Sequence, residues 1–226
     1  MSLFLRINCV KSENEPPNPL TELLKGRSFF PVRRKQVLFH EGHPALGVYY
    51  LEAGRAKVYK TGCNGRPYIL FFAGSAELLN AECILESGEF ATSAEMLEDG
   101  RVVFIERERL LSLVGDSLPL SLFIAGELAR RTTSSYEERV RLADGRVRER
   151  MARALALLGS DYGRDEADGR SISLRLSRDE LASMIGTTPA TVMRLLRDFK
   201  DEGAILLAGR RIVVSNMEYL EKVGQI

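Results

Sequence analysis

Two short helices joined by a very short turn are predicted by the segment 176–205, LSRDELASMIGTTPATVMRLLRDFKDEGAI. Ser177 and Glu180 have the spacing of a capping box, in which each side chain accepts a hydrogen bond from the other residue's amide and a helix begins. Gly186 follows where a left-handed residue ends such a helix. Thr188 can cap the next helix, and Pro189 suits its first position. We therefore expect one helix from Ser177 to Gly186 and a second from Thr188 to Gly203.

The second of these helices has an apolar and a polar face. Val192, Leu195, Leu196 and Phe199 form the apolar face, so Ala190, Thr191, Arg194, Arg197 and Lys200 point outward. The following AILLAGRRIVVS predicts two strands around Gly209, which form a wing. Such a winged helix-turn-helix places its second helix in the major groove of double-stranded DNA. The candidate DNA-binding residues are Thr188, Ala190, Thr191, Arg194, Arg197, Lys200, Arg210 and Arg211.

Charge alone does not decide this prediction. Residues 144–226 hold 14 Lys and Arg against 13 Asp and Glu, and the whole chain has a net charge of +1. A helix-turn-helix also occurs in proteins that never touch DNA. The argument for DNA binding is the combination of helix spacing, cap order and wing, together with a local basic face that a small net charge allows.

The segment from Phe29 to Glu106 predicts short strands. QVLFHEG, VYYLEAG, RAKVYKTG and RPYILFFAG are each a few β-favouring residues closed by glycine. Their rhythm indicates a small antiparallel β-roll of the jelly-roll or cupin-like kind. The Cys63-Asn64-Gly65 sequence is typical of a tight hairpin. We expect an α+β chain: an N-terminal antiparallel β-roll, a long helix and a C-terminal winged helix-turn-helix.

A long helix is predicted between these two parts, from about 118 to 143. Leu120, Phe123, Ile124 and Leu128 share one face, whereas the later turns, ARRTTSSYEERVR, are almost entirely polar. About 25 residues make a helix ~37 Å long, which is more than one small roll requires. Two interpretations stay open: dimerisation through an identical helix, which we favour, and a solvated connector.

The next segment is predicted as a helix, a loop and a strand. The helix covers 144–160 and has Val147, Met151, Leu155 and Leu158 on one face. The loop is GSDYGRDEADGR, and the strand is SISLRLS.

Composition excludes several classes. The chain has 226 residues, 45% of them apolar and 28% charged, as in an ordinary globular protein. No apolar run reaches the ~18–20 residues of a membrane span, and the N-terminus lacks the parts of a signal peptide. We expect a cytoplasmic protein without a membrane partner. Cys9, Cys63 and Cys83 are odd in number and widely spaced, which does not indicate a disulfide framework.

From about Phe29 onward the chain resembles the Crp/Fnr transcription regulators. The resemblance lies in HEGHPALGVYYLEAGRAKVY, in LARRTTSSYEERVRLADGRVRERMARALALL and in the helix-turn-helix. It implies a homodimer on a palindromic site with half-sites one helical turn apart, and RNA polymerase as a further partner. The expected domains are an N-terminal arm (1–25), an effector-sensing β-roll (26–115), a dimerisation helix (116–143) and a DNA-binding domain (144–226).

The resemblance also implies roles for two residues of the second helix. Arg194 falls where the family keeps an arginine that contacts guanine, whose O6 and N7 suit a guanidinium. Many members carry a glutamate at the place of Ala190. Because a methyl group cannot accept a hydrogen bond from cytosine but can contact the methyl of thymine, we expect an A·T pair at the inner position of the half-site.

The stretch GEFATSAEM, residues 88–96, bears on the effector. The nucleotide binders of this family have an arginine here that pairs with the buried phosphate, whereas this chain has Ala91 and Thr92. The next arginine, Arg101, is at the far end of a strand. On the long helix the nucleotide-contacting positions become Ser135 and the bulky Tyr136. A cyclic nucleotide is therefore not the expected effector.

Haem and metal ions are further alternatives. The family's carbon-monoxide sensors have their haem ligands near ELLNAECILESG, where this chain has Leu78 and Asn80. If haem or a metal binds, His40, His43 and Cys83 are the candidate ligands, with Glu41 as a further one; surface histidines are the plainer interpretation. Three cysteines do not supply the four thiolates of an iron–sulfur cluster. A thiol switch and a cupin-like metal enzyme fused to a DNA-binding domain stay open as rivals.

The halorespiration regulators, which bind chlorinated phenols, give the best pattern match for the pocket, and regulators of nitrosative stress are also similar. The first implies an apolar or aromatic small-molecule effector, the second a haem that binds NO or CO. The candidate pocket residues are Phe72, Leu79, Phe90, Thr92 and Tyr136. No catalytic motif is present, so we do not expect an enzyme. DNA binding without any effector is the remaining alternative.

Overall fold

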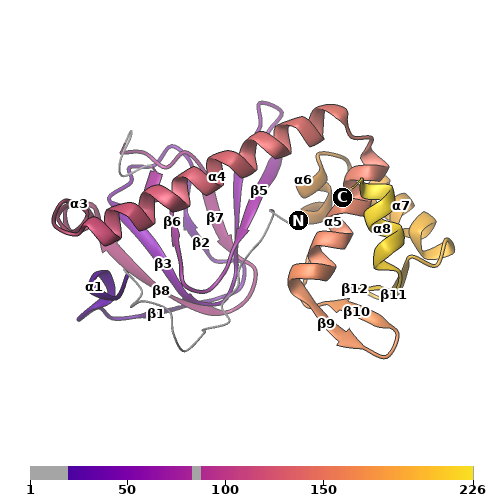
Figure 1. The fold of residues 1–226 in the computed structure, drawn as a ribbon, viewed down its shortest axis with the longest axis horizontal. Coiled ribbons are helices and arrows are strands. Elements are labelled where there is room, and N and C mark those ends of the chain that lie inside the picture. The colour runs from indigo at the N-terminus through magenta and orange to yellow at the C-terminus, as the bar shows by residue number, and fades with distance from the viewer. Residues whose placement is uncertain (1–19, 83–87, 226) are drawn as a thin grey trace. The chain divides into compact units, whose positions relative to one another are not determined.

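The structure, a computed structural model, describes residues 20–82 and 88–225 (Figure 1). Within them the chain divides into two compact units. The first holds residues 20–65 and 70–135, and the second holds residues 66–69 and 136–225. The long helix α4 (Leu118–Asp144) supplies residues to both.

The first unit contains two four-stranded antiparallel sheets. Their strand orders are β1-β8-β3-β6 and β2-β7-β4-β5. The strands are β1 (Phe30–Val32), β2 (Val37–Phe39), β3 (Gly47–Ala53), β4 (Ala56–Thr61), β5 (Pro67–Ala73), β6 (Glu77–Leu79), β7 (Ser93–Met96) and β8 (Gly100–Glu106). The predicted β-roll is confirmed. The tight turn at Cys63-Asn64-Gly65 is also present between β4 and β5, with Gly65 at a φ of 73°.

Alternating side chains of these strands form one apolar core. Strands β3 and β8 pair with Val48 opposite Ile105, and both side chains are fully buried. Gly47 is required at the start of β3, because a Cβ there would lie 2.3 Å from the carbonyl oxygen of Ile105. Phe39 stacks on Phe90 with ring centroids 4.5 Å apart, which extends the core to the end of β2.

Two helices before α4 differ from the expectation. Residues 1–19 of the proposed N-terminal arm lie outside the described residues, but α1 (Thr21–Leu24) does not behave as an arm: Leu20 and Leu23 are completely buried in the core of the roll. Helix α3 (Arg107–Asp116) was not predicted, and it buries Leu110 against the same core. Apolar residues that were counted as loop or roll thus close one end of the sheets.

Helix α4 confirms the predicted long helix. Leu120 and Ile124 are buried in the core of the roll, and Phe123 and Leu128 pack against it, as their spacing predicted. The polar run 132–135 stabilises itself, since each of its four hydroxyls donates to the carbonyl four residues earlier at 2.8–3.2 Å. This local bonding explains how a polar segment continues the helix.

The second unit is a winged helix-turn-helix built around α5. Its elements are α5 (Val147–Tyr162), β9 (Gly163–Glu166), β10 (Gly169–Ile172), α6 (Arg178–Ile185), α7 (Pro189–Asp201), β11 (Ile205–Ala208), β12 (Arg211–Val214) and α8 (Met217–Gly224). The four strands form one antiparallel sheet in the order β11-β12-β10-β9. Met151, Leu155 and Leu158 of α5 are buried, as predicted.

The loop predicted over GSDYGRDEADGR was wrong. Helix α5 continues to Tyr162, and residues 163–166 pair with β10 as a hairpin. The glycines that indicated a loop serve close packing instead: a Cβ on Gly163 would lie 2.0 Å from the carbonyl oxygen of Gly159. The strand expected over SISLRLS is shifted for the same reason, since pairing with β9 begins at Gly169 and β10 ends at Ile172.

Within the described residues, no single helix is long and apolar enough to cross a membrane. One bent pair, Arg107–Asp116 with Leu118–Val140 at 113°, meets the criteria of length and composition when the two helices are taken together.

Candidate nucleic-acid interface and effector site

The predicted caps fix both helices of the helix-turn-helix. The Ser177 amide donates to the Glu180 carboxylate at 2.7 Å, and the Glu180 amide donates to Ser177 Oγ at 3.1 Å. Gly186 has a φ of 65° and ends α6 in the left-handed conformation. Thr188 Oγ1 accepts from the Thr191 amide at 3.3 Å, so α7 begins directly after the turn. These local bonds set the angle between the two helices.

The interior of the unit holds α7 in place. Val192, Leu195, Leu196 and Phe199 are buried, as predicted. The guanidinium of Arg148 on α5 lies over the Phe199 ring at 4.7 Å and donates to Glu202 at 2.7 Å. The hydrogen bond to Glu202 raises the pKa of Arg148. A helix anchored on its inner face in this way presents a fixed set of outer side chains.

The outer face of α7 carries the predicted candidates. Ala190, Arg194, Arg197 and Lys200 are exposed, and Thr191 is half-buried. Arg194 pairs with Asp198 at 3.3 Å, an exposed contact that contributes little and can be exchanged for another anion. Among the residues that the structure describes, Arg197 and Lys200 have no ion pair. Thr188 and Thr191 are occupied with each other, since their hydroxyls lie 3.0 Å apart.

The wing has the predicted strands, with Gly209 at a φ of 61° in the turn. Arg210 is exposed, and Arg211 forms an ion pair with Glu166 of β9 at 2.9 Å. This pair is not evident from the sequence, which predicts a loop at Glu166. Arg211 must therefore leave Glu166 to contact phosphate, whereas Arg210 need not.

Two residues of this surface were not among the candidates. Met193 is 47% exposed on the outer face of α7. Arg178 at the start of α6 donates to the carbonyl of Gly209 in the wing at 3.5 Å, and its Nη1 is buried without a partner. Burial lowers the pKa of Arg178. Its position at the start of α6 was evident from the sequence, whereas its contact with the wing was not. A half-buried guanidinium with an unused donor is suited to an anion.

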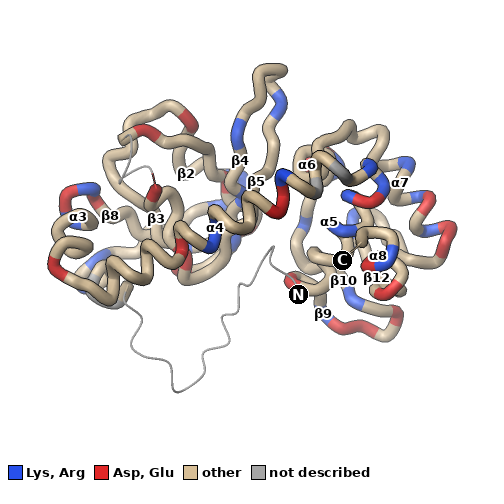
Figure 2. The backbone as a smooth tube through the Cα atoms, turned by 45° about the horizontal axis from the view of Figure 1, so that its top comes forward, with Lys and Arg blue, Asp and Glu red and all other residues tan. Residues whose placement is uncertain are grey.

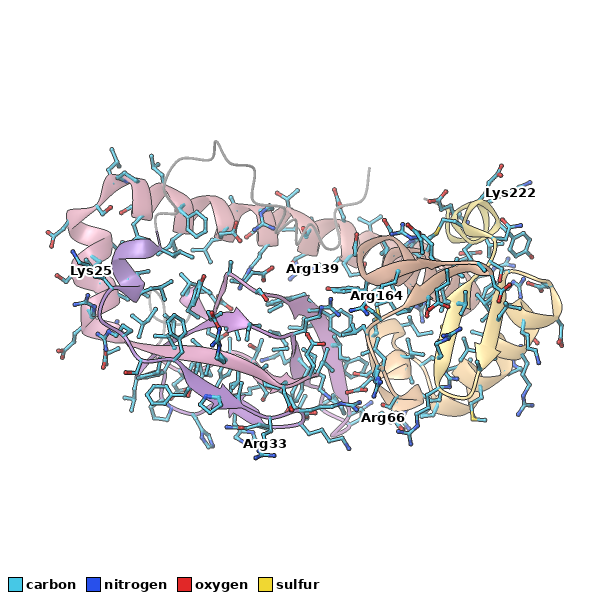
Figure 3. All side chains as sticks on the ribbon, turned by 90° about the horizontal axis from the view of Figure 1, so that it is seen from below. Lys25, Arg33, Arg66, Arg139, Arg164 and Lys222 are labelled. Carbon is cyan, nitrogen blue, oxygen red and sulfur yellow. The ribbon has the colours of Figure 1, made fainter. Side chains whose placement is uncertain are left out.

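Charge is mixed over the whole unit. Figure 2 shows Lys and Arg interleaved with Asp and Glu along its elements. Figure 3 labels Arg164 on β9 and Lys222 on α8, which lie well apart. Any basic face of this unit is therefore formed by a few individual side chains on α7 and the wing, and not by an overall excess of positive charge.

The candidate effector residues are partly assembled in the roll. Leu79 and Phe90 belong to one core, and Phe72 is buried on β5. The hydroxyl of Thr92 donates to Asn80 Oδ1 at 3.2 Å, and Asn80 Nδ2 is buried without a partner. Tyr136 is 60% exposed on α4 and belongs to the second unit.

Ala91 stands where nucleotide-binding proteins of this kind have an arginine that pairs with phosphate, and an ion pair without net charge lies beside it. The carbonyl of Ala91 accepts from Lys60 Nζ at 2.8 Å, and the same Nζ lies 2.5 Å from Glu41. The Glu41 carboxylate also accepts from the Thr61 amide, and the hydrogen bond from Lys60 lowers the pKa of Glu41. Arg101 forms a bidentate pair with Glu52 at 2.6 and 2.7 Å.

A largely buried carboxylate lies where the roll meets α4. Burial raises the pKa of Glu77 on β6 to about 7, against the lowering effect of Arg131. Arg131 itself donates to the carbonyl of Leu78 at 2.8 Å, and its guanidinium lies over the ring of Phe71 at 4.8 Å. This cluster is not evident from the sequence, because Glu77 and Arg131 are 54 residues apart and neither belongs to a motif.

The metal candidates are only loosely assembled. The rings of His40 and His43 lie 5.5 Å apart and both side chains are exposed, whereas Glu41 is held by Lys60. Cys83 and Cys9 lie outside the described residues, and Cys63 is a free, exposed thiol. Among the described residues, no three His, Cys, Asp or Glu side chains gather as a metal site requires.

The chain matches two family models. One describes a cyclic nucleotide-binding domain and covers residues 29–117; the other describes a Crp-like helix-turn-helix domain and covers residues 149–223. The CRP-like cAMP-activated global transcriptional regulator of Mycobacterium tuberculosis is 26% identical over 91% of this chain and 92% of that protein. The cyclic AMP receptor protein of Thermus thermophilus is 28% identical over 83% of both chains.

A solved structure shows the same fold. The c-di-GMP responsive global regulator CLP of Xanthomonas campestris aligns with a TM-score of 0.78 at 23% identity, over 87% of this chain and 97% of that one. These relatives are transcription regulators. The β-roll, the long helix and the winged helix-turn-helix, together with both family models, show that this chain belongs to the Crp/Fnr family of DNA-binding transcription regulators with an effector-binding domain.

Proposed function

We propose that this chain is a homodimeric, sequence-specific transcription regulator whose effector is not a cyclic nucleotide. The observation that carries the DNA-binding part is the outer face of α7, where Arg194, Arg197 and Lys200 are exposed on a helix fixed by its caps and core. The proposed parts of the chain are an N-terminal segment (1–25) whose Leu20 and Leu23 pack into the roll, an effector-sensing roll (26–115), a dimerisation helix (116–143) and a DNA-binding domain (144–226).

The homodimer is supported by the exposed face of α4. Leu118 and Leu122 are 70% and 64% exposed, and Ala125, Ala129 and Thr132 follow at alternating steps of three and four residues, all exposed. This is the spacing of a coiled-coil seam, and the small side chains allow two helices to approach closely. A connector helix in solvent would have no use for such a stripe. Tyr136 continues the same stripe, which gives it a second possible role beside the effector.

The DNA half-site follows from the outer face of α7. Arg194 suits the O6 and N7 atoms of guanine, and Ala190 suits the methyl of thymine, so the inner position is an A·T pair. Arg197, Lys200, Arg210 and Arg211 supply charge for phosphates. Two-fold symmetry places two such half-sites one helical turn apart.

In vitro selection from random duplexes tests this proposal. The expected product is an inverted repeat with one guanine in each half-site and A·T at the inner position. Arg194→Ala should remove the guanine preference, whereas Lys222→Ala on α8 serves as a control that leaves it. Recovery of no repeat would contradict DNA reading by α7, and a G·C pair at the inner position would contradict the role of Ala190.

The exclusion of cyclic nucleotides rests on the surroundings of Ala91. A cyclic phosphate buried there would need a positive partner. Lys60 and Arg101 are each paired with a carboxylate, Glu41 and Glu52, which the phosphate would have to displace. An apolar or aromatic molecule among Phe72, Leu79, Phe90 and Thr92 needs no such partner, and a haem that binds NO or CO is the second possibility. Because Leu79 is fully buried, its neighbours must move to admit either.

The effector proposal is tested by a spectrum and by calorimetry. The purified dimer is first scanned in the ultraviolet and visible range, alone and with haem and NO or CO; a stoichiometric Soret band that shifts with gas would support haem, and His40, His43 and Cys83 would be the first variants. Titration with cyclic AMP and cyclic GMP should then release no heat. Saturable binding of either nucleotide would contradict the proposal.

A further partner and a location complete the proposal. RNA polymerase is expected from the family, and cytoplasmic location follows from DNA binding. Effector binding would shift the population between two arrangements of the dimer, by binding one of them more tightly.

A further inference from the structure

The outer face of α7 changes character along its length. Its first exposed residues, Pro189, Ala190 and Met193, carry no group that donates or accepts a strong hydrogen bond, whereas Arg194, Arg197 and Lys200 follow toward its end. The first turn, which a helix of this kind directs at base edges, is thus apolar, Arg194 follows it within the first half of the helix, and Arg197 and Lys200 lie in the second half.

Met193 is not part of the interior. Its neighbour Val192 is completely buried, and the buried stripe continues through Leu195, Leu196 and Phe199, whereas Met193 is 47% exposed. Met193 thus extends the exposed apolar surface of Pro189 and Ala190 beside the cationic Arg194, Arg197 and Lys200. Such a surface is complementary to a partner that offers an apolar group among anionic ones.

Residues three and four apart on a helix lie side by side, so Met193 adjoins Ala190, and Arg194 adjoins both Ala190 and Arg197. The hydroxyl of Thr191 does not add a reading group to this strip, because it lies 3.0 Å from that of Thr188 and turns toward the cap. On the first half of the helix, direct hydrogen bonding to a base therefore falls to Arg194 alone.

We propose that Met193 is a specificity-determining residue that packs against the 5-methyl group of a thymine, beside the guanine that Arg194 contacts. The inference rests on the proposed function. In the major groove the thymine methyl is the one apolar group on any base edge, and anionic phosphates surround it. Met193 and Ala190 then read two thymines through methyl contacts, so each half-site holds a guanine flanked by thymines.

The unbranched thioether of methionine adapts to irregular apolar surfaces, which suits a groove whose width varies with sequence. Cytosine at the same place has no methyl group and presents an amino group instead. Met193 would exclude water from that amino group without accepting a strong hydrogen bond from it, which is costly. Met193 thereby discriminates against a C·G pair as well as favouring T·A.

The test removes single methyl groups from the DNA. The full-length dimer is titrated by fluorescence anisotropy against the selected operator, in which each thymine is replaced in turn by deoxyuridine in both half-sites. Deoxyuridine keeps every hydrogen-bonding group of thymine and lacks only the methyl. The same series is measured with Met193→Ala, with Met193→Leu, and with Leu206→Ala, a control that truncates an exposed apolar side chain on β11.

For wild type we expect deoxyuridine at one symmetric position to weaken binding about fourfold per half-site, the equivalent of one buried methyl group, and so about 16-fold for the dimer. Met193→Ala should abolish that loss while it retains the loss at the thymine read by Ala190. Met193→Leu should keep both losses, and so should Leu206→Ala. Circular dichroism of Met193→Ala should match that of wild type, because the side chain is outside the core.

Three results would overturn the inference. Met193→Ala could retain every methyl effect of wild type, or wild type could show none. Met193→Ala could also bind all duplexes as wild type does and yet fail to activate transcription, which would assign the side chain to a protein partner. Each of these leaves sequence-specific binding intact; a wild-type protein that prefers no duplex at all refutes the proposed function as well.

Discussion

Replacing Glu77 by glutamine should stabilise the roll at alkaline pH and leave its stability unchanged in acid. The carboxylate lies on β6 among Arg131, Arg130 and Glu127 of α4 and the amide of Gly74, and burial raises its pKa from 4.5 to about 7. The folded state therefore binds this proton more tightly than the unfolded state. Stability from Glu77 is fully present below pH 4.5 and is lost as the pH rises through about 7.

The pKa difference corresponds to about 3 kcal/mol of unfolding free energy, an order-of-magnitude figure. Above pH 7 the wild-type protein must hold a buried negative charge that Glu77→Gln does not have. We expect the variant to be more stable than wild type by about 1–3 kcal/mol at pH 8, and by much less at pH 5.

Urea denaturation at pH 5, 6, 7 and 8, followed by circular dichroism at one protein concentration, measures the effect as the difference between variant and wild type. Other groups that titrate in this range cancel in that difference, among them Asp161, whose pKa burial raises to about 6. Glu108→Gln, at an exposed position on α3, is the control and should show a constant difference. A difference for Glu77→Gln that does not grow with pH would refute the reasoning.

Three further predictions follow. Arg194→Ala should weaken binding to the selected operator by about 1–3 kcal/mol per half-site in fluorescence anisotropy and make all bases equivalent at the guanine position; a uniform loss on every sequence would make Arg194 a phosphate contact. Leu122→Glu should convert the dimer to a monomer in analytical ultracentrifugation, because it places two like charges in the α4 seam, and an unchanged sedimentation coefficient would contradict that seam. Gly186→Ala should lower the unfolding free energy of the DNA-binding unit by about 1–2 kcal/mol through its φ of 65°, as measured by thermal unfolding; no loss would show that the turn has another conformation.

The helix-turn-helix was predictable because its signals are local. Ser177 with Glu180, and Thr188 with Pro189, satisfy the free amides of a helix start within four residues, and Gly186 ends α6 with its own backbone conformation. The face of α7 followed from the spacing of its apolar residues. Interactions of this range can be read from the order of residues alone.

The hairpin β9–β10 was missed because its glycines are required by close backbone approaches that only the fold creates. A Cβ on Gly163 would lie 2.0 Å from the carbonyl oxygen of Gly159, at the end of α5, and a Cβ on Gly169 would lie 2.2 Å from the carbonyl oxygen of Val214, 45 residues away. Without the fold, both read as loop residues. Leu20 and Leu23 were assigned to an arm for a similar reason, since only the assembled sheets provide the core that buries them.

The effector site was the least predictable part, because its side chains come from separated segments. Thr92 meets Asn80 and Lys60 meets Glu41 only through the pairing of the strands, and Glu77 meets Arg131 only when α4 packs on the roll. Absence of the expected arginine at Ala91 was evident from the sequence, whereas the neutral pair beside it was not. Met193 was missed because the exposure of its side chain depends on which other elements pack against α7, and the sequence does not show this.

Sequence-specific DNA binding by α7 and the wing is the central property proposed for this chain. The decisive measurement is the affinity of the full-length protein for the selected operator and for a scrambled duplex, by fluorescence anisotropy, between about 50 and 200 mM salt. We predict an operator affinity at least about a thousandfold above that for the scrambled duplex, and a steep fall with salt as the arginines and lysines of both protomers release counterions. Equal affinity for both duplexes, or a flat salt response, would contradict the account.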